Sequence, residues 1–218
     1  MKKIGVVLSG CGVMDGSEIH EAVITLLALD RAGAQAINIA PNVELDEINH
    51  LTNQPTGKKR NVLQESARIA RGDIKDIAAI KASDVDALIF PGGYGAAKNL
   101  CDFATKGAAA KPHPEVARLV REVYAAKKPI GALCIAPALL ACILGRELHP
   151  ELTIGSDAGT AAALEKMGAR HVAVTVGEIV IDKQNKIVST PAYMCARSIK
   201  EAADGIEKLV TAILKLAQ

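Results

Sequence analysis

The sequence has very few aromatic side chains: among its 218 residues there are two Phe, three Tyr and no Trp. Single-stranded nucleic acids are usually bound by stacking their bases on aromatic rings, and this chain lacks such a platform. Positive charge is not in large excess either, because the 26 Lys and Arg residues are nearly balanced by 24 Asp and Glu residues. The basic residues form no stripe along the sequence that could neutralise phosphates. We therefore expect no nucleic-acid partner.

Long apolar runs are also missing. The strand-like runs fall far short of the roughly 18 to 20 residues that span a bilayer, so we expect no membrane partner. The segment 1–11 imitates a lipoprotein signal, but its apolar stretch, 4–8, is shorter than the ~7 to 15 residues of such a signal. This predicts a location in the cytoplasm.

Cysteine and histidine patterns typical of disulfide or metal frameworks are absent. The five cysteines form no Cys-x-x-Cys pair, and an odd number in a long chain argues against a disulfide scaffold and for a reducing compartment. The five histidines show no ligand spacing, and Glu18, His20 and Glu21 are interpreted as one mixed polar region, so no metal is expected. The glycines after the first predicted strand do not have dinucleotide-loop spacing, and no cofactor is expected.

The chain is rich in apolar residues, and strand-like and helical sequence patterns alternate along it. Half of its residues are hydrophobic and 23% are charged, enough to form a core, and the length fits one domain over residues 1–218. Short β-branched runs alternate with helical patterns throughout. This predicts an α/β fold with a mostly parallel sheet and helices on both faces.

The predicted elements follow this alternation. Strands are expected at 4–8, 34–40, 87–90, 130–133, 171–176, 179–182 and 187–190. Helices are expected at 17–32, 61–71, 114–126, 136–144, 160–167 and 196–216. The polar stretch 42–60 shows no period and is predicted to be a loop, and 184–186 to be a hairpin turn.

The most informative segment is 129–137, where an apolar strand ends in Cys134 and a helix begins at once. Such a turn places the thiol at the carboxyl end of the sheet, like a nucleophile elbow. The N–H groups and dipole of the helix are expected to lower the thiol pKa from its usual ~8.5. The alternative for Cys134 is a buried core cysteine, which is how we interpret Cys101, Cys142 and Cys195 on helical patterns.

Two further elements are candidates for the same site. Gly92 and Gly93 follow a strand, and their backbone N–H groups, with that of Ile135, could hold a developing oxyanion, although a tight turn explains the glycines equally well. Glu21 lies in the helix after the first strand, where its carboxylate could reach a thiol at a neighbouring strand end. Its alternative role is that of an ordinary acid near a helix N-terminus.

Together, these segments resemble the PfpI, class I glutamine amidotransferase-like superfamily, and within it the ElbB-like branch. The segments that carry the resemblance are 8–13, 15–22, 91–100, 134–138 and 190–194. The resemblance implies a flavodoxin-like three-layer sandwich that is usually dimeric, with Cys134 as nucleophile and Glu21 hydrogen-bonded to it. Gly10, Asn99 and Pro191 lie in the matching segments and are expected to help bind substrate.

The activity that the resemblance implies is a cofactor-free glyoxalase, which converts glyoxal or a similar small 2-oxoaldehyde to a hydroxy acid. The aldehyde would add to Cys134 as a hemithioacetal, and Glu21 would move a proton between its carbons. Related enzymes often have a histidine after the cysteine, but Ile135 stands here. A non-catalytic cysteine redox sensor or regulatory binding protein is therefore the main alternative.

A glutamine amidohydrolase is a less favoured possibility. Such enzymes use a His-Pro-Glu element far downstream of the cysteine, and the chain has two such triplets, at 113–115 and 149–151. The first precedes Cys134 and the second lies in a predicted loop soon after it. Both are interpreted as surface turns.

Overall fold

The computed structural model describes residues 1–218 and has a central sheet between two helical layers. The seven strands are ordered β10-β11-β7-β6-β1-β2-β5, and all neighbours are parallel except β10 and β11. Their bounds are β1 Lys3–Val7, β2 Gln35–Ala40, β5 Lys75–Asp76, β6 Ala87–Phe90, β7 Ile130–Leu133, β10 Val180–Asp182 and β11 Ile187–Thr190. The predicted α/β class with a mostly parallel sheet is confirmed.

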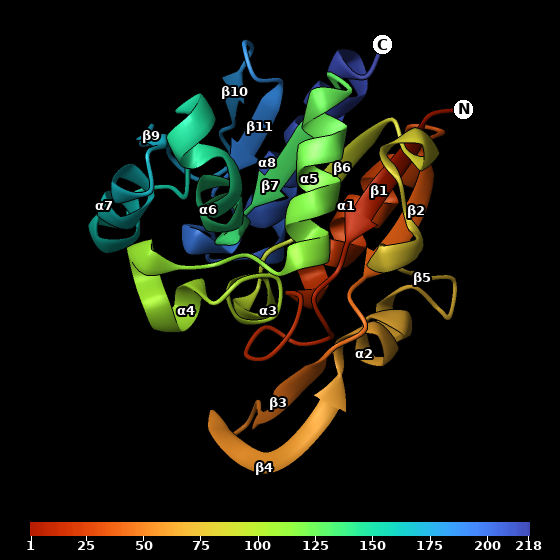
Figure 1. Ribbon diagram of the computed structural model, residues 1–218, viewed down its shortest axis with the longest axis vertical. Helices are drawn as coiled ribbons and strands as arrows, with labels where there is room; N and C mark the ends of the chain where they lie inside the picture. The colour runs from red at the N-terminus through yellow and green to blue at the C-terminus, as the bar shows by residue number, and fades with distance from the viewer.

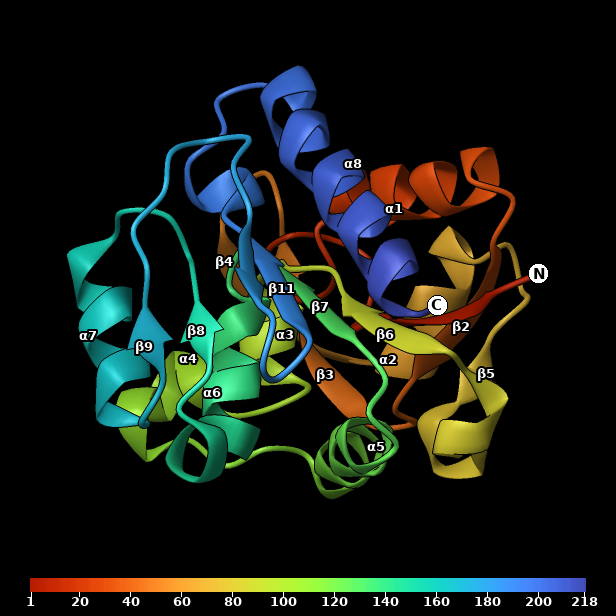
Figure 2. The ribbon, with the colours of Figure 1, turned by 90° about the horizontal axis from the view of Figure 1, so that it is seen from above.

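Helices cover both faces of this sheet (Figures 1 and 2). On one face lie α1 Ile19–Arg31, α2 Val62–Ile69 and α8 Ile199–Leu216; on the other lie α5 Pro114–Ala125 and α6 Ala136–Leu148. The shorter helices are α3 Tyr94–Lys98, α4 Phe103–Lys106 and α7 Ala158–Lys166, with 3-10 turns at Ile77–Ala79, Ala82–Asp84, Gly107–Ala109 and Ala192–Met194. No helix combines the length and apolar character required to cross a membrane.

The central strands have the uniform burial of a sheet covered on both sides. Residues 4–7, 87–90 and 130–133 are all buried, so these strands read as continuous apolar runs rather than alternating ones. Their side chains pack into two hydrophobic cores, one between the sheet and helices α5 and α6, and the other between the sheet and helices α1 and α8. The carboxyl ends of β1, β6, β7 and β11 meet at one edge of the sheet.

Most predicted elements are confirmed within a few residues, but the segment 42–60 is not a loop. It forms the hairpin of β3 Glu44–Asn49 and β4 Gln54–Asn61, which projects from the body (Figure 1). Leu45 is buried, whereas β4 is exposed almost throughout, so no alternation marks the strand. Ion pairs such as Lys59 Nζ to Asp46 Oδ1, 2.7 Å apart, link the two strands.

A second difference concerns the predicted strand 171–176. Only β9 Arg170–His171 forms there, paired in parallel with β8 Glu151–Leu152. The partner strand is equally short, and one hydrogen bond from Val172 N to Leu152 O, 2.8 Å, ends the pairing. The predicted hairpin turn between β10 and β11 is confirmed.

Candidate active site at the end of β7

Cys134 occupies the turn between β7 and α6, as the sequence predicts. Its φ of 56° lies in the left-handed region, which is uncommon for a residue other than glycine and is typical of strained turns at functional sites. Its backbone N–H donates to the Thr190 carbonyl, at 3.0 Å, and so ties the turn to the end of β11. The side chain is only 8% exposed.

Glu21 from α1 lies beside this thiol and is completely buried. Its Oε2 accepts the Gly92 N–H at 2.8 Å and its Oε1 accepts the Tyr193 N–H at 3.1 Å. The Cys134 thiol lies close to the same carboxyl group, beside Gly92. The structure thus brings together the two residues expected to act as nucleophile and proton carrier.

The carboxyl group of Glu21 has an unusually high proton affinity. Burial raises its pKa from 4.5 to about 7, and the negative charge of Glu18 adds to this, while the N–H groups of Tyr193 and Gly92 oppose it. A carboxyl group that titrates near neutral pH can both accept and release a proton.

The expectation of a lowered thiol pKa is wrong. Burial, followed by the nearby Glu21 carboxylate, raises the pKa of Cys134 well above its ordinary value. The N–H groups of Gly93 and Ile135 lower that pKa, as predicted for a helix N-terminus, but they do not offset the loss of water around the sulfur. Cys134 is therefore a thiol at neutral pH, and it must lose its proton as it reacts.

The glycines after β6 allow these groups to approach one another. A Cβ added at Gly92 would overlap the Cβ of Cys134 and lie 2.7 Å from Glu21 Oε2 and 3.0 Å from Cys134 Sγ. Gly93 has a φ of 93°, and a Cβ there would overlap the backbone of Glu18. Close approach, rather than a turn alone, explains both glycines.

A cavity of about 440 Å³ opens beside Cys134 and is mostly apolar. Three of the predicted site residues line it: Gly93, Cys134 and Ile135. The rest of its wall consists of Val13, Glu18, Tyr94, Ala97, Phe103, Ala104, Asp157, Thr160, Tyr193 and Met194. The site therefore offers room for a small molecule next to the sulfur.

Gly10, Asn99 and Pro191 do not line this cavity. The Asn99 amide donates to the carbonyls of Ser9 and Asp15, both at 2.8 Å, and the Gly10 N–H donates to Ser66 Oγ at 2.9 Å. Pro191 follows β11 and precedes the turn that carries Tyr193. They hold loops in place around the site, and their contact with substrate stays a prediction.

Sequence reasoning missed Tyr193 and His20. The Tyr193 hydroxyl is 2.8 Å from His20 Nδ1, and Ala192, with a φ of 43°, turns the chain so that Tyr193 faces the cavity. Glu18 Oε1 lies 3.8 Å from the same His20 nitrogen. Tyr193 stands in a segment that carries the family resemblance, but 173 positions separate it from His20, so spacing could not pair them.

The two His-Pro-Glu triplets lie away from the cavity. His113 precedes α5, and His149 follows α6, with its Nδ1 2.8 Å from the Gly168 carbonyl. Neither histidine lines the cavity beside Cys134. No group of three His, Cys, Asp or Glu side chains is placed to hold a metal ion.

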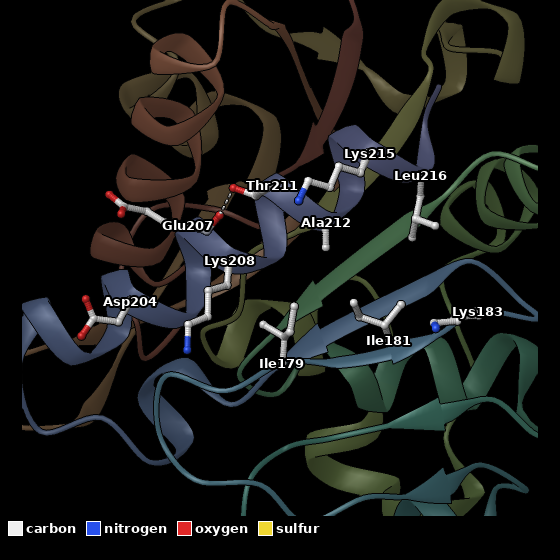
Figure 3. A pocket seen from close by; sticks show the side chains of 10 residues that line it. All are labelled: Ile179, Ile181, Lys183, Asp204, Glu207, Lys208, Thr211, Ala212, Lys215 and Leu216. Carbon is white, nitrogen blue, oxygen red and sulfur yellow. Dashed lines mark hydrogen bonds between the residues drawn. The ribbon is translucent and has the colours of Figure 1, made fainter.

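A larger hollow, of about 980 Å³, lies elsewhere, between α8 and the β10 edge of the sheet (Figure 3). Ile179 and Ile181 face Lys208 and Lys215 across it, and the hydrogen bond that Figure 3 draws joins the Thr211 hydroxyl to the Glu207 carbonyl, at 2.8 Å. It contains no cysteine or histidine. The reactive groups are those beside Cys134.

Comparison with known proteins places this site in context. No protein-family profile matches the chain. The human mitochondrial protein "glutamine amidotransferase-like class 1 domain-containing protein 3" is 46% identical over 225 residues, which covers 98% of this chain and 83% of that protein. The zebrafish (Danio rerio) mitochondrial ES1 protein is 35% identical, covering 98% of this chain and 85% of its own length.

Solved structures of similar proteins have the same fold as this chain. An isoprenoid biosynthesis protein with an amidotransferase-like domain from Ehrlichia chaffeensis superposes with a TM-score of 0.91 at 39% identity, covering 98% of this chain and 99% of that one. A DJ-1 superfamily protein from Salmonella typhimurium gives 0.58 at 20% identity, covering 99% and 91%, which shows a shared fold.

The fold and the cysteine turn define an amidotransferase-like protein, and its fold is shared by a protein of the DJ-1 superfamily. Within that class, the chain belongs to the family of the ES1 and glutamine amidotransferase-like class 1 domain-containing 3 proteins.

Proposed function

We propose that this protein is a cofactor-independent glyoxalase of the ElbB-like branch, which converts glyoxal or a similar small 2-oxoaldehyde to a hydroxy acid. The observation that carries the proposal is the pairing of the buried Cys134 thiol with a carboxyl group of pKa about 7, beside a small apolar cavity. This pairing supplies a nucleophile and a proton carrier without a metal or an organic cofactor.

The first step is addition of sulfur to the aldehyde. The Cys134 thiol passes its proton to the Glu21 carboxylate as the sulfur attacks the aldehyde carbon. The N–H groups of Gly93 and Ile135, which face the sulfur, stabilise the oxyanion that forms. Glu21 then gives the proton to that oxygen, which completes the hemithioacetal.

The second step moves hydrogen from the first carbon to the second. The Glu21 carboxylate takes the proton on the first carbon and delivers it to the second, and the hydroxyl proton of the first carbon is transferred to the oxygen on the second, which leaves a thioester on Cys134. Water hydrolyses this thioester, which releases glycolate from glyoxal or lactate from methylglyoxal and restores the thiol. No net oxidation occurs, because one carbon is oxidised as its neighbour is reduced.

The experiment is to incubate the purified protein with glyoxal or methylglyoxal, without glutathione or metal, and to quantify the hydroxy acid. We expect product from the wild type and its loss in Cys134→Ser and Glu21→Gln. Cys142→Ser is the matched control, since Cys142 is half-buried on α6 and lines a different hollow. An inactive wild type would overturn the proposal.

The thiol chemistry disfavours the main alternative, a redox sensor. Oxidation by peroxide proceeds through the thiolate, and a thiol whose pKa burial raises reacts slowly. If the wild type is inert towards aldehydes but Cys134 is nevertheless its most readily oxidised thiol by mass spectrometry, the sensor becomes the better explanation.

We also propose a homodimer, supported by an apolar stripe on α1. Ile19, Val23 and Leu27 recur every four residues along one side of the helix and are 42%, 48% and 41% exposed. Sedimentation velocity of the wild type should give a dimer, and Val23→Lys should give a monomer. A monomeric wild type would contradict the proposal.

For location we propose the cytoplasm, supported by five free cysteines, as expected in a reducing compartment. The human and zebrafish relatives carry the word mitochondrial in their names. Fractionation of cells that express the protein at its natural level distinguishes the two locations.

A further inference from the structure

We propose that Tyr193 is a catalytic acid of this site: its hydroxyl protonates the oxygen on the second carbon of a 2-oxoaldehyde, and a hydrogen bond from His20 holds the resulting phenolate. The inference rests on the proposed function, and it identifies the proton donor that the pair of Cys134 and Glu21 leaves unassigned. The carrying observations are the position of Tyr193 in the cavity wall and its 2.8 Å contact with His20 Nδ1.

The chemistry requires such a donor. When Glu21 removes the proton from the first carbon, the electron pair moves into the bond between the carbons, and negative charge develops on the second oxygen. The N–H groups of Gly93 and Ile135 face the sulfur and therefore serve the oxygen on the first carbon. Glu21 is occupied with the carbon-bound proton, so another side chain must protonate the second oxygen.

The other titratable side chains of the cavity wall, those of Asp157, Glu18 and Tyr94, are less suitable. Asp157 caps α7 by accepting the Thr160 N–H at 2.7 Å, and this contact lowers the pKa of its carboxyl group, which remains an acceptor. Glu18 caps α1 as the acceptor of a backbone N–H, at 2.7 Å. Tyr94 is 50% exposed, and its ring contacts the Lys98 ammonium group, 5.3 Å from the ring centre.

Tyr193 differs from these groups in three respects. Burial and the charges of Glu18 and Glu21 raise the pKa of its phenol, so it carries its proton at neutral pH. Its own backbone N–H donates to Glu21 Oε1, which fixes the residue next to the other reacting group. When His20 carries its proton on Nδ1, the ring donates to the phenol oxygen and leaves the phenol proton free for the substrate.

The proton balance closes within the site. Tyr193 gives its proton to the second oxygen as Glu21 takes the proton from the first carbon, which forms an enediol bound to Cys134. Glu21 then delivers its proton to the second carbon, and the Tyr193 phenolate takes the hydroxyl proton of the first carbon as the thioester carbonyl forms. Both residues return to their starting states before water enters.

The test compares Tyr193→Phe with Tyr124→Phe, the loss of a phenol that does not line the cavity and donates to Asn185 Oδ1 instead. We expect hydroxy-acid formation by Tyr193→Phe to be about 100-fold slower or more, the usual effect of losing a general acid, and Tyr124→Phe to stay near the wild type. Methylglyoxal deuterated at the aldehyde carbon should show a larger isotope effect with Tyr193→Phe, because proton removal becomes more strongly rate-limiting.

The role of His20 is tested by rescue. Its side chain is 48% exposed, so added imidazole can reach the space left in His20→Ala. We expect His20→Ala to slow turnover and imidazole to restore part of it, which a purely structural role would not allow. Failure of imidazole to restore activity would overturn the part assigned to His20.

The outcomes separate this inference from the proposed function. If the wild type forms hydroxy acid and Tyr193→Phe matches Tyr124→Phe, the role of Tyr193 is overturned and the glyoxalase stands. If the wild type forms no hydroxy acid, the glyoxalase proposal fails and the assignment of Tyr193 falls with it.

Discussion

Replacing Glu21 by glutamine should change how the stability of the protein depends on pH. The Glu21 side chain is completely buried, and this burial raises the pKa of its carboxyl group from 4.5 to about 7. A group whose pKa is raised by folding stabilises the folded state fully below its unfolded pKa and loses that contribution as the pH rises through its folded pKa. Glutamine in its place does not titrate.

The magnitude follows from the two pKa values. The interval from 4.5 to about 7, at about 1.4 kcal/mol per pH unit, corresponds to about 3 kcal/mol. The free energy of unfolding of the wild type, taken relative to Glu21→Gln, should therefore fall by about that amount between pH 4.5 and pH 8. The fall should lie mostly between those two pKa values.

The assay is urea unfolding of both proteins at half-unit pH intervals, followed by circular dichroism. Glu207→Gln, which removes an exposed carboxylate from α8, reports the general effect of losing one acid. Parallel curves for the wild type and Glu21→Gln would refute the reasoning, because they would mean that folding does not change the proton affinity of Glu21.

Four further predictions follow from the same contacts. Gly92→Ala should lower stability by about 1 to 3 kcal/mol and abolish turnover, since the added methyl overlaps Cys134; normal turnover would contradict the packing. Cys134 should be alkylated slowly by iodoacetamide at pH 7 and faster in Glu21→Gln, measured by mass spectrometry of its peptide; equal rates would exclude an effect of the carboxylate. Turnover should rise with pH through about 7 as Glu21 ionises, and a flat profile from pH 5.5 to 8.5 would count against it as the base. Phe90→Ala should cost about 3 to 5 kcal/mol in urea unfolding, because the ring is fully buried between β6 and the α5 layer; a loss below 1 kcal/mol would be inconsistent with that burial.

The parts of the fold that sequence could predict are those determined by local pattern. The apolar strand before Cys134 and the helix after it are contiguous, so their turn follows from neighbouring residues. The hairpin of β3 and β4 could not be found in this way, because β4 is exposed along its length and has no buried face to impose alternation.

The electrostatics of the site depend on residues distant in sequence. The prediction for the Cys134 pKa used only the adjoining helix, and that contribution has the expected sign. The Cys134 pKa is nevertheless raised, because burial and the nearby Glu21 carboxylate of α1 outweigh the contribution of the helix. A pKa that depends on the whole packing around a thiol cannot be predicted from the helix that follows it.

A protonated thiol beside a carboxylate suits addition to an aldehyde better than a permanent thiolate would. An isolated thiolate at this depth would be costly, because burial penalises the charged form. Aldehydes are strong electrophiles, so the proton can leave for Glu21 as the carbon–sulfur bond forms, and the charge moves directly to an oxygen that meets backbone N–H groups. Oxidation by peroxide, by contrast, depends on thiolate that is already present. The same burial that raises the Cys134 pKa therefore favours carbonyl chemistry over oxidation, which is why aldehyde turnover and slow oxidation are expected together in this site.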